Sequence, residues 1–257
     1  MLLAFDLDKT LLTDDYQLPT RIADSVLKAR SAGHLVTVLT GRPLLAATDY
    51  LDQLAIDTPH SVNHGSLIRD PAGAVMRRKR LTADDVDGLI VQHLDDHLIE
   101  FTCVVDEKLF VRDPANERWN WVHASSRKLE QFAPGMRLDA DKVVFHGNGR
   151  SEGLEKLVAR SYPRLLRYLW GDGYLEIVPE GGDKGSALAY IAETLGVARS
   201  DVIAFGDGLN DVSMLAWAGR AVAVGPDAHE DALALADEHI ASPEEGGVAD
   251  WLDQNLL

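Results

Sequence analysis

The sequence predicts an α/β protein, a doubly wound parallel-sheet core with an inserted α+β domain. Short β-rich runs alternate with segments of helical period near both ends of the chain, and hairpin-rich sequence fills the middle. The expected boundaries are a first core part at residues 1–80, the inserted domain at 81–181 and a second core part at 182–257. Both ends of the chain would then build one sheet.

Strand and helix alternate through the first eighty residues. Apolar residues at helical spacing follow Pro19, and Gly33 is suited to the C-terminal cap of that helix. The expected strands are Leu2–Phe5, Leu35–Thr40 and Ser61–Asn63, the expected helices run from Pro19 to Gly33 and from Leu44 to Leu54, and a turn at Asp70–Gly73 separates the β-runs Leu67–Ile68 and Val75–Met76.

The alternation of strands and helices stops after residue 80. Thr82 with Asp85 three residues on is typical of a helix start. Further elements expected in the insert are a hairpin of Phe101–Val105 and Leu109–Val111, β-runs at Val143–Phe145, Leu165–Leu169 and Tyr174–Val178, and helices at Ser125–Phe132 and Gly153–Arg160. The alternation then resumes with helices at Lys184–Leu195, Asp211–Ala218, Ala228–Ala236 and Val248–Leu252 and strands at Val202–Phe205 and Ala221–Val224.

The composition limits the partners. Of 257 residues, 25 are Lys or Arg and 41 are Asp or Glu, a formal net charge of -16 that argues against nucleic-acid binding, which is mostly electrostatic. No apolar run approaches the ~18 residues that a membrane span needs, and Asp6 and Asp8 stand where a signal peptide would be apolar. Cys103 is the single cysteine, which fits a cytoplasmic location. We expect a monomer or a small homo-oligomer.

Two aspartates, Asp6 and Asp8, follow the first strand. Ligands of open parallel sheets bind beyond the carboxyl ends of the strands, and side chains two residues apart point the same way in an extended chain. Two converging carboxylates favour a cation between them or protonation of one. The alternatives are a solvated loop, or an Asp8 that only caps a local turn.

A second acidic pair, Asp207 and Asp211, follows the strand that ends at Phe205. The neighbouring glycines permit a tight turn, and carboxylates are ligands that magnesium prefers, together with waters and substrate phosphate. Asn210 or Asp211 could instead only cap the following helix, although capping does not exclude a metal role.

Groups that could hold phosphate stand at two further strand or helix ends. Thr40-Gly41-Arg42 supplies a hydroxyl and backbone N–H groups, and Lys184 opens a helix, where an ammonium and the helix N-terminus favour an anion. A geometric turn and a surface lysine are the simpler explanations of each motif alone. The histidines, His64 among them, show no zinc-ligand spacing and are interpreted as surface or core residues.

Together these motifs resemble those of the haloacid dehalogenase (HAD) superfamily of phosphohydrolases. Its four motifs are matched in order by Asp6-Leu7-Asp8-Lys9-Thr10, Leu39-Thr40-Gly41-Arg42, Asp183-Lys184-Gly185 and Gly206-Asp207-Gly208-Leu209-Asn210-Asp211. The position and β-rich character of the insert are similar to the Cof-type subgroup, which has a large type IIB cap. The resemblance covers nearly the whole chain.

The resemblance implies a role for each site residue. Asp6 would attack phosphorus and form an aspartyl-phosphate, while Asp8 would protonate the leaving oxygen and later activate water. Thr40 and Lys184 would hold the transferring group, in a phosphate-binding set of Thr40, Gly41, Arg42, Lys184 and Asn210. Mg²⁺ would be bound by Asp6, the main-chain carbonyl of Asp8, Asp207 and Asp211, the last as a ligand or as a partner of the ligands.

Two positions depart from the family's pattern. Lys9 stands where the family usually has glycine, and a cation beside a general acid is unfavourable unless it points away from Asp8. His64 stands where the family typically has asparagine. We therefore carry over no contact from the loop at residues 63–66.

The sequence thus predicts an enzyme, a cytoplasmic Mg²⁺-dependent phosphatase whose partner is a small phosphorylated metabolite, with no nucleic acid and no membrane. Sugar phosphates are the first expected substrates, and flavin mononucleotide or pyridoxal phosphate the next. One alternative is a phosphomutase or phosphotransferase acting on sugar phosphates. The other is a non-catalytic sensor that binds a phosphorylated metabolite.

Overall fold

The computed structural model describes residues 1–119, 122 and 127–257, which form two compact units. The core unit consists of Met1–Arg78 and Asp183–Leu257, and the inserted unit is Lys79–Gly182. The insert thus begins at residue 79 where the sequence suggested 81, and ends at 182 where it suggested 181. None of the described helices is long and apolar enough to cross a membrane.

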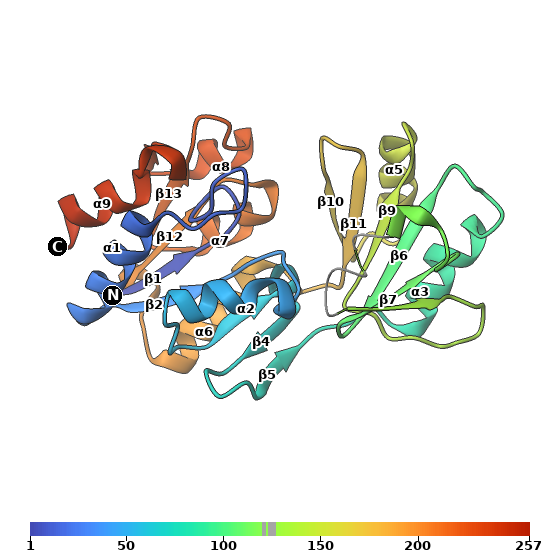
Figure 1. Cartoon of the computed structure of the whole chain (residues 1–257), viewed down its shortest axis with the longest axis horizontal. Coiled ribbons are helices and arrows are strands. Elements are labelled where there is room, and N and C mark those ends of the chain that lie inside the picture. Colours follow the sequence, from blue (N-terminus) through green and yellow to red (C-terminus); the bar gives the residue numbers. More distant parts are fainter. Residues whose placement is uncertain (120–121, 123–126) are drawn as a thin grey trace. The chain divides into compact units, whose positions relative to one another are not determined.

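A five-stranded sheet lies in the middle of the core unit (Figure 1). Its strands are β1 (Leu2–Phe5), β2 (Leu35–Val38), β12 (Val202–Gly206), β13 (Arg220–Val224) and β14 (Glu238–Ile240). They lie in the order β14-β13-β12-β1-β2, and each neighbouring pair is parallel. The two ends of the chain therefore meet where β1 pairs with β12, which confirms the doubly wound sheet.

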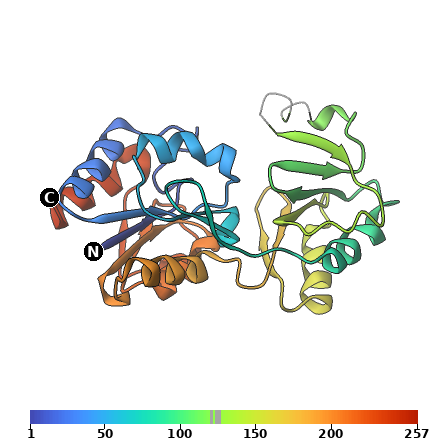
Figure 2. The same ribbon diagram turned by 90° about the horizontal axis from the view of Figure 1, so that it is seen from below.

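Helices cover both faces of this sheet (Figure 2). They are α1 (Thr20–Ser31), α2 (Leu44–Gln53), α6 (Lys184–Leu195), α7 (Val212–Trp217), α8 (Glu230–Leu235) and α9 (Gly247–Asn255). Alternate side chains of β1 enter two cores: Leu3 and Phe5 join the core that includes α1, α2 and α9, whereas Leu2 and Ala4 join the core that includes α6, α7 and α8. Burial on both faces explains why these strands read as continuous apolar runs.

A small antiparallel sheet extends the core unit after α2. It contains β3 (His60–Val62), β4 (Leu67–Arg69) and β5 (Val75–Arg78). A parallel bridge between Leu39 and Ser61 links β3 to the end of β2. The predicted turn at Asp70–Gly73 is confirmed by a backbone hydrogen bond from Gly73 N–H to Asp70 O at 2.9 Å.

The inserted unit contains a six-stranded sheet with two longer helices packed on one face. Its elements are α3 (Ala83–Ile90), β6 (Glu100–Val105), β7 (Lys108–Val111), β8 (Lys128–Gln131), β9 (Lys142–His146), α5 (Ser151–Ser161), β10 (Leu166–Leu169) and β11 (Tyr174–Val178). The order is β10-β11-β9-β6-β7-β8, with the predicted hairpin as β6 and β7. Thr82 and Asp85 form the predicted capping box of α3.

One prediction of secondary structure is wrong, and one strand was not predicted. Residues 128–131, expected within a helix at Ser125–Phe132, form strand β8, because pairing with β7 outweighs the helix propensity of this segment. Residues 125 and 126 of that helix lie outside the described part of the chain. Strand β14 was not predicted, since its three half-exposed or exposed residues give no apolar run.

Candidate active site

The carboxyl ends of β1 and β12 bring distant acids together. Asp6 directly follows β1 and Asp207 directly follows β12. Asp6 N–H donates to Phe205 O at 3.0 Å, so the two strand ends stay in register. Thr10 Oγ1 donates to Asp207 Oδ1 at 3.0 Å, although the two residues are 197 positions apart in the chain. The structure therefore places the first and the last motif at one edge of the sheet.

Three acids and one lysine form the centre of this site. Asp6, Asp207 and Asp211 each offer one carboxylate oxygen, and these oxygens lie within 4.8 Å of one another. Lys184 Nζ lies 2.6 Å from Asp6 Oδ1 and 2.5 Å from Asp211 Oδ1, with no exposed surface. When all four groups are ionised, three negative charges face one positive charge, an excess that a divalent cation would balance.

The pKa values reflect this crowding. Burial raises the pKa of Asp6 well above its usual value; Lys184 opposes that rise, and the neighbouring carboxylates add to it. Burial, followed by the charge of Asp211, raises the pKa of Asp207 to about 7. Burial disfavours the ammonium of Lys184, but Asp211 and Asp6 outweigh it and raise the pKa of the lysine. Ionised acids at this site therefore need cations beside them.

Asp211 organises the loop that follows β12. Its Oδ2 accepts hydrogen bonds from the backbone N–H groups of Asp207 at 3.1 Å and Gly208 at 2.9 Å, while its Oδ1 contacts Lys184. A Cβ on Gly206 would lie 2.6 Å from Asp211 Cγ, so glycine is required for this close approach. Both oxygens of Asp211 are thus engaged by the protein itself.

The start of α6 explains the burial of Lys184. Asp183 caps this helix, with its Oδ1 accepting from Ser186 N–H at 2.8 Å. A Cβ on Gly185 would lie 2.4 Å from Ser213 O, so glycine allows α6 to pack closely against α7. The Asp183-Lys184-Gly185 motif therefore combines a cap, a buried cation and a close helix contact.

The turn after β2 positions Thr40, which is fully buried. Thr40 N–H donates to Ser61 O at 3.0 Å, and its Oγ1 accepts from Arg42 N–H at 3.1 Å. Because the Thr40 oxygen acts as an acceptor here, its own O–H proton can be donated to a ligand.

The guanidinium of Arg42 binds Asp8. Its Nε lies 2.9 Å from Asp8 Oδ2 and its Nη2 lies 2.5 Å from Asp8 Oδ1, a two-point contact. The Arg42 Cζ atom also lies 5.0 Å from the ring centroids of both Tyr16 and Tyr50. Sequence reasoning missed the two tyrosines, since no motif or spacing connects them to Arg42.

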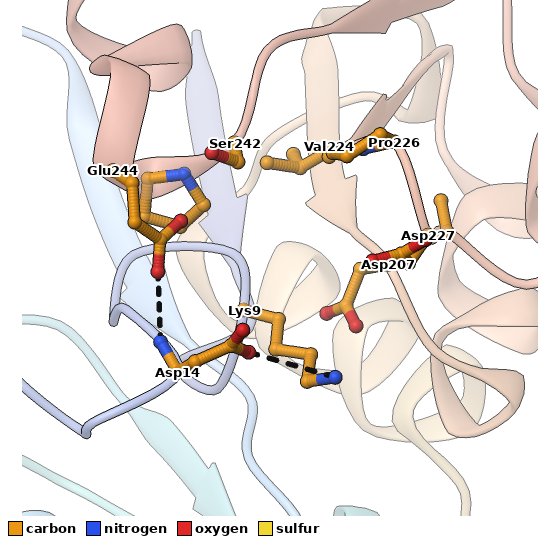
Figure 3. A pocket seen from close by; sticks show the side chains of 11 residues that line it. Lys9, Asp14, Asp207, Val224, Pro226, Asp227, Ser242 and Glu244 are labelled. Carbon is orange, nitrogen blue, oxygen red and sulfur yellow. Dashed lines mark hydrogen bonds and ion pairs between the residues drawn. The ribbon is translucent and has the colours of Figure 1, made fainter.

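Lys9 faces a pocket beside Asp207 (Figure 3). Its Nζ pairs with Asp14 Oδ1 at 3.6 Å, and both side chains are exposed. Residues 224–228 and 242–244 complete the lining of the pocket. Lys9 has a φ of 57°, the left-handed conformation that glycine adopts most easily. The cation that departs from the family's pattern therefore pairs with Asp14, while Arg42 is the partner of Asp8.

Two more side chains, to which the sequence assigned no role, contact predicted site residues. Thr10, bonded to Asp207, belongs to the first motif, so that motif contained the signal for it. His64 Nδ1 lies 3.2 Å from Asn210 Nδ2. The sequence predicted a surface or core residue at His64 and carried over no contact from its loop; the side chain is buried within the site.

Fold and site together define an α/β enzyme whose polar groups meet at the point where strand order reverses. A family model described as haloacid dehalogenase-like hydrolase matches residues 3–252. The chain therefore belongs to the haloacid dehalogenase-like hydrolases. The resemblance inferred from the four motifs is confirmed.

Relatives and solved structures agree with this placement. The chain is 25% identical to the 5-amino-6-(5-phospho-D-ribitylamino)uracil phosphatase YitU of Bacillus subtilis, over 98% of this chain and 96% of that protein. It is 26% identical to the pyridoxal phosphate phosphatase YbhA of Escherichia coli, over 99% and 98%. The solved structure of the HAD subclass IIB sugar phosphatase BT4131 has a TM-score of 0.84 at 22% identity, covering 98% of both chains, and shows the same fold.

Proposed function

We propose that this protein is a Mg²⁺-dependent phosphatase that removes phosphate from small phosphorylated metabolites through an aspartyl-phosphate on Asp6. The observation that carries the proposal is the convergence of Asp6, Asp207 and Asp211 around buried Lys184. A sensor that only binds phosphate does not need a buried carboxylate at the centre of its site, whereas covalent transfer to an aspartate does.

The acidic group fits a magnesium ion. Asp6, the main-chain carbonyl of Asp8 and Asp207 would hold it, and Mg²⁺ would neutralise charge on the nucleophile and the phosphate. Asp211 is best assigned as a partner of the ligands, because backbone N–H groups and Lys184 already engage its two oxygens. The proposal thus takes the second of the two roles that the resemblance left open for Asp211.

In the proposed reaction the Asp6 carboxylate attacks phosphorus, and the bond from phosphorus to the leaving oxygen breaks. Asp8 must leave its two-point contact with Arg42 to take up a proton, which it then donates to that oxygen. As a carboxylate it later removes a proton from the water that hydrolyses the aspartyl-phosphate. Lys184 screens the negative charge of Asp6 from the anionic substrate. The Thr40 hydroxyl, Gly41 N–H, Lys184 and Asn210 bind the phosphoryl oxygens.

The substrate class is part of the proposal. The names of the two relatives specify small phosphorylated molecules, pyridoxal phosphate and a phosphoribityl compound. These names fit the substrate class expected from the sequence. We propose sugar phosphates as the first substrates, with flavin mononucleotide or pyridoxal phosphate next. The inserted unit, Lys79–Gly182, would be the cap that selects the leaving group. A cytoplasmic location fits the single free cysteine, Cys103.

A substrate panel tests the proposed function. Phosphorylated metabolites are assayed for release of inorganic phosphate with Mg²⁺ and with Mg²⁺ removed by a chelator. We expect hydrolysis of several members with Mg²⁺ and none without it. Transfer of phosphate to an added sugar, with little free phosphate, would instead favour the phosphotransferase. Binding without turnover of any member would favour the sensor.

The pairing of Arg42 with Asp8 leads to a separate prediction. We expect Arg42→Lys to lower kcat about tenfold, because lysine keeps the charge but cannot make the two-point contact that orients the Asp8 carboxylate as the base in the hydrolysis step. The inhibition constant of inorganic phosphate should hardly change. Steady-state kinetics with p-nitrophenyl phosphate measure both quantities.

Tyr16→Phe is the matched control, since it keeps the ring beside Arg42 and loses only the phenolic hydroxyl. We expect it to resemble the wild type. If Arg42→Lys instead weakens phosphate inhibition and leaves kcat unchanged, the guanidinium binds phosphate, as the family resemblance implied, and does not act through Asp8.

A further inference from the structure

The loop between β3 and β4 has a strained backbone beside the site. Asn63, His64 and Gly65 have φ values of 50°, 63° and 118°, a left-handed run that costs free energy at the two residues with side chains. Two backbone hydrogen bonds hold it in place: Asn63 N–H donates to Arg42 O at 2.8 Å, and His64 N–H donates to Thr40 O at 2.9 Å. The loop is thereby attached to the turn after β2.

This backbone places the imidazole of His64 against Gly41. His64 is 2% exposed, and a Cβ on Gly41 would lie 2.5 Å from its Cε1 atom. Glycine at position 41 thus leaves the space that the imidazole fills. The Nδ1 atom of His64 lies 3.2 Å from Nδ2 of Asn210, which is also buried. The imidazole therefore connects the turn after β2 with the loop after β12.

The contact with Asn210 determines where the ring proton lies. An amide nitrogen has two donors and no acceptor, so His64 Nδ1 must accept the hydrogen bond and Nε2 must carry the proton. The amide is fixed in turn. One of its N–H groups points to His64, and its Oδ1 lies 2.8 Å from the position that a Cβ on Gly208 would occupy. The second N–H of Asn210 is therefore held in one direction.

We propose that His64 is a positioning residue that holds the Asn210 amide with its second N–H toward the transferring phosphoryl group. The proposal rests on the proposed function, in which Asn210 contacts phosphate. A donor fixed in direction before the charge arrives stabilises a phosphate oxygen better than one that must reorient. His64, which stands where the family typically has asparagine, would thereby orient a phosphate-binding group of the site.

A matched pair of substitutions tests this role. His64→Gln keeps a side-chain acceptor, whereas His64→Met has a similar length without a strong one, and both carry the same backbone cost. The dissociation constant of inorganic phosphate is measured by ³¹P NMR on the protein with Mg²⁺. We expect His64→Met to weaken phosphate binding about tenfold and His64→Gln about twofold or less. Equal affinities in both variants and the wild type would overturn the proposal.

Action through Asn210 also predicts that the effects are not additive. Asn210→Ala should weaken phosphate binding by itself, and adding His64→Met should weaken it no further. Additive losses would show that His64 acts on phosphate by another route, and would overturn the positioning role.

A measurement on the wild type keeps the proposal testable if a variant does not fold. Histidine ¹⁵N NMR at about pH 8, where an ordinary histidine is neutral, should show the His64 proton on Nε2. A proton on Nδ1 would overturn the inference. Wild-type protein that binds no inorganic phosphate would overturn the proposed function and this inference with it, whereas the outcomes above overturn the inference alone.

Discussion

Asp6→Asn is expected to reduce phosphate release about 1,000-fold or more while the protein still folds. Asparagine has the shape of aspartate, but its amide cannot attack phosphorus. The same change removes one of three acids that lie within 4.8 Å of one another. Since burial and these neighbours raise the pKa of Asp6, we expect the metal-free variant to be at least as stable as the metal-free wild type.

Phosphate release and thermal unfolding without metal measure the two effects. Asp14→Asn is the matched control, because Asp14 is an exposed acid of the same region that pairs with Lys9. It should leave both quantities near the wild-type values. Mass spectrometry must exclude deamidation of the new asparagine, which would restore the nucleophile. Wild-type turnover in intact Asp6→Asn would refute the assigned nucleophile, and a large loss of stability would contradict the crowding of the acids.

The part of the site that follows from strand ends could be predicted from the sequence. Asp6 follows β1, Thr40 lies just beyond β2 and Asp207 follows β12, and the carboxyl ends of neighbouring parallel strands meet at one edge. Each motif alone allowed a structural explanation. Their combination did not depend on side-chain detail, because backbone topology alone brings them together.

The contacts between side chains could not be predicted. The sequence motif predicted that Arg42 belongs to a phosphate-binding turn. In the structure the Arg42 guanidinium contacts Asp8 and lies beside two tyrosine rings. That contact depends on the conformation of the turn and on the loop that contains Tyr16. The position of His64 could not be predicted either. Its approach to Asn210 requires a left-handed backbone, and a histidine in the sequence does not indicate that conformation.

Tertiary pairing also overrode local preference in the inserted unit. Lys128, Leu129 and Glu130 are good helix formers, yet they form strand β8 because β7 offers a free edge beside them. The capping box at Thr82 and Asp85, by contrast, is a local arrangement of side chain and backbone, and it could be predicted from two residues.

Lys184→Met is expected to destabilise the metal-free core unit by about 3–5 kcal/mol. Methionine replaces most of the buried lysine side chain, being one atom shorter, but it leaves Asp6 and Asp211 without the cation that lies 2.6 and 2.5 Å from them. Removing one partner from a buried ion pair costs more than the pair contributes, because the remaining charge is not compensated. Urea unfolding of the metal-free wild type and variant measures the difference.

The double variant Lys184→Met with Asp211→Asn separates loss of charge balance from loss of packing. If the uncompensated carboxylate causes the damage, neutralising Asp211 should recover part of the stability, so the double variant should be more stable than Lys184→Met alone. Added Mg²⁺ should also stabilise the single variant, since a divalent cation can replace the missing charge. Lys184→Met with the stability of the wild type in the absence of metal would mean that the lysine does not balance these acids, and the electrostatic basis of the site would have to be abandoned.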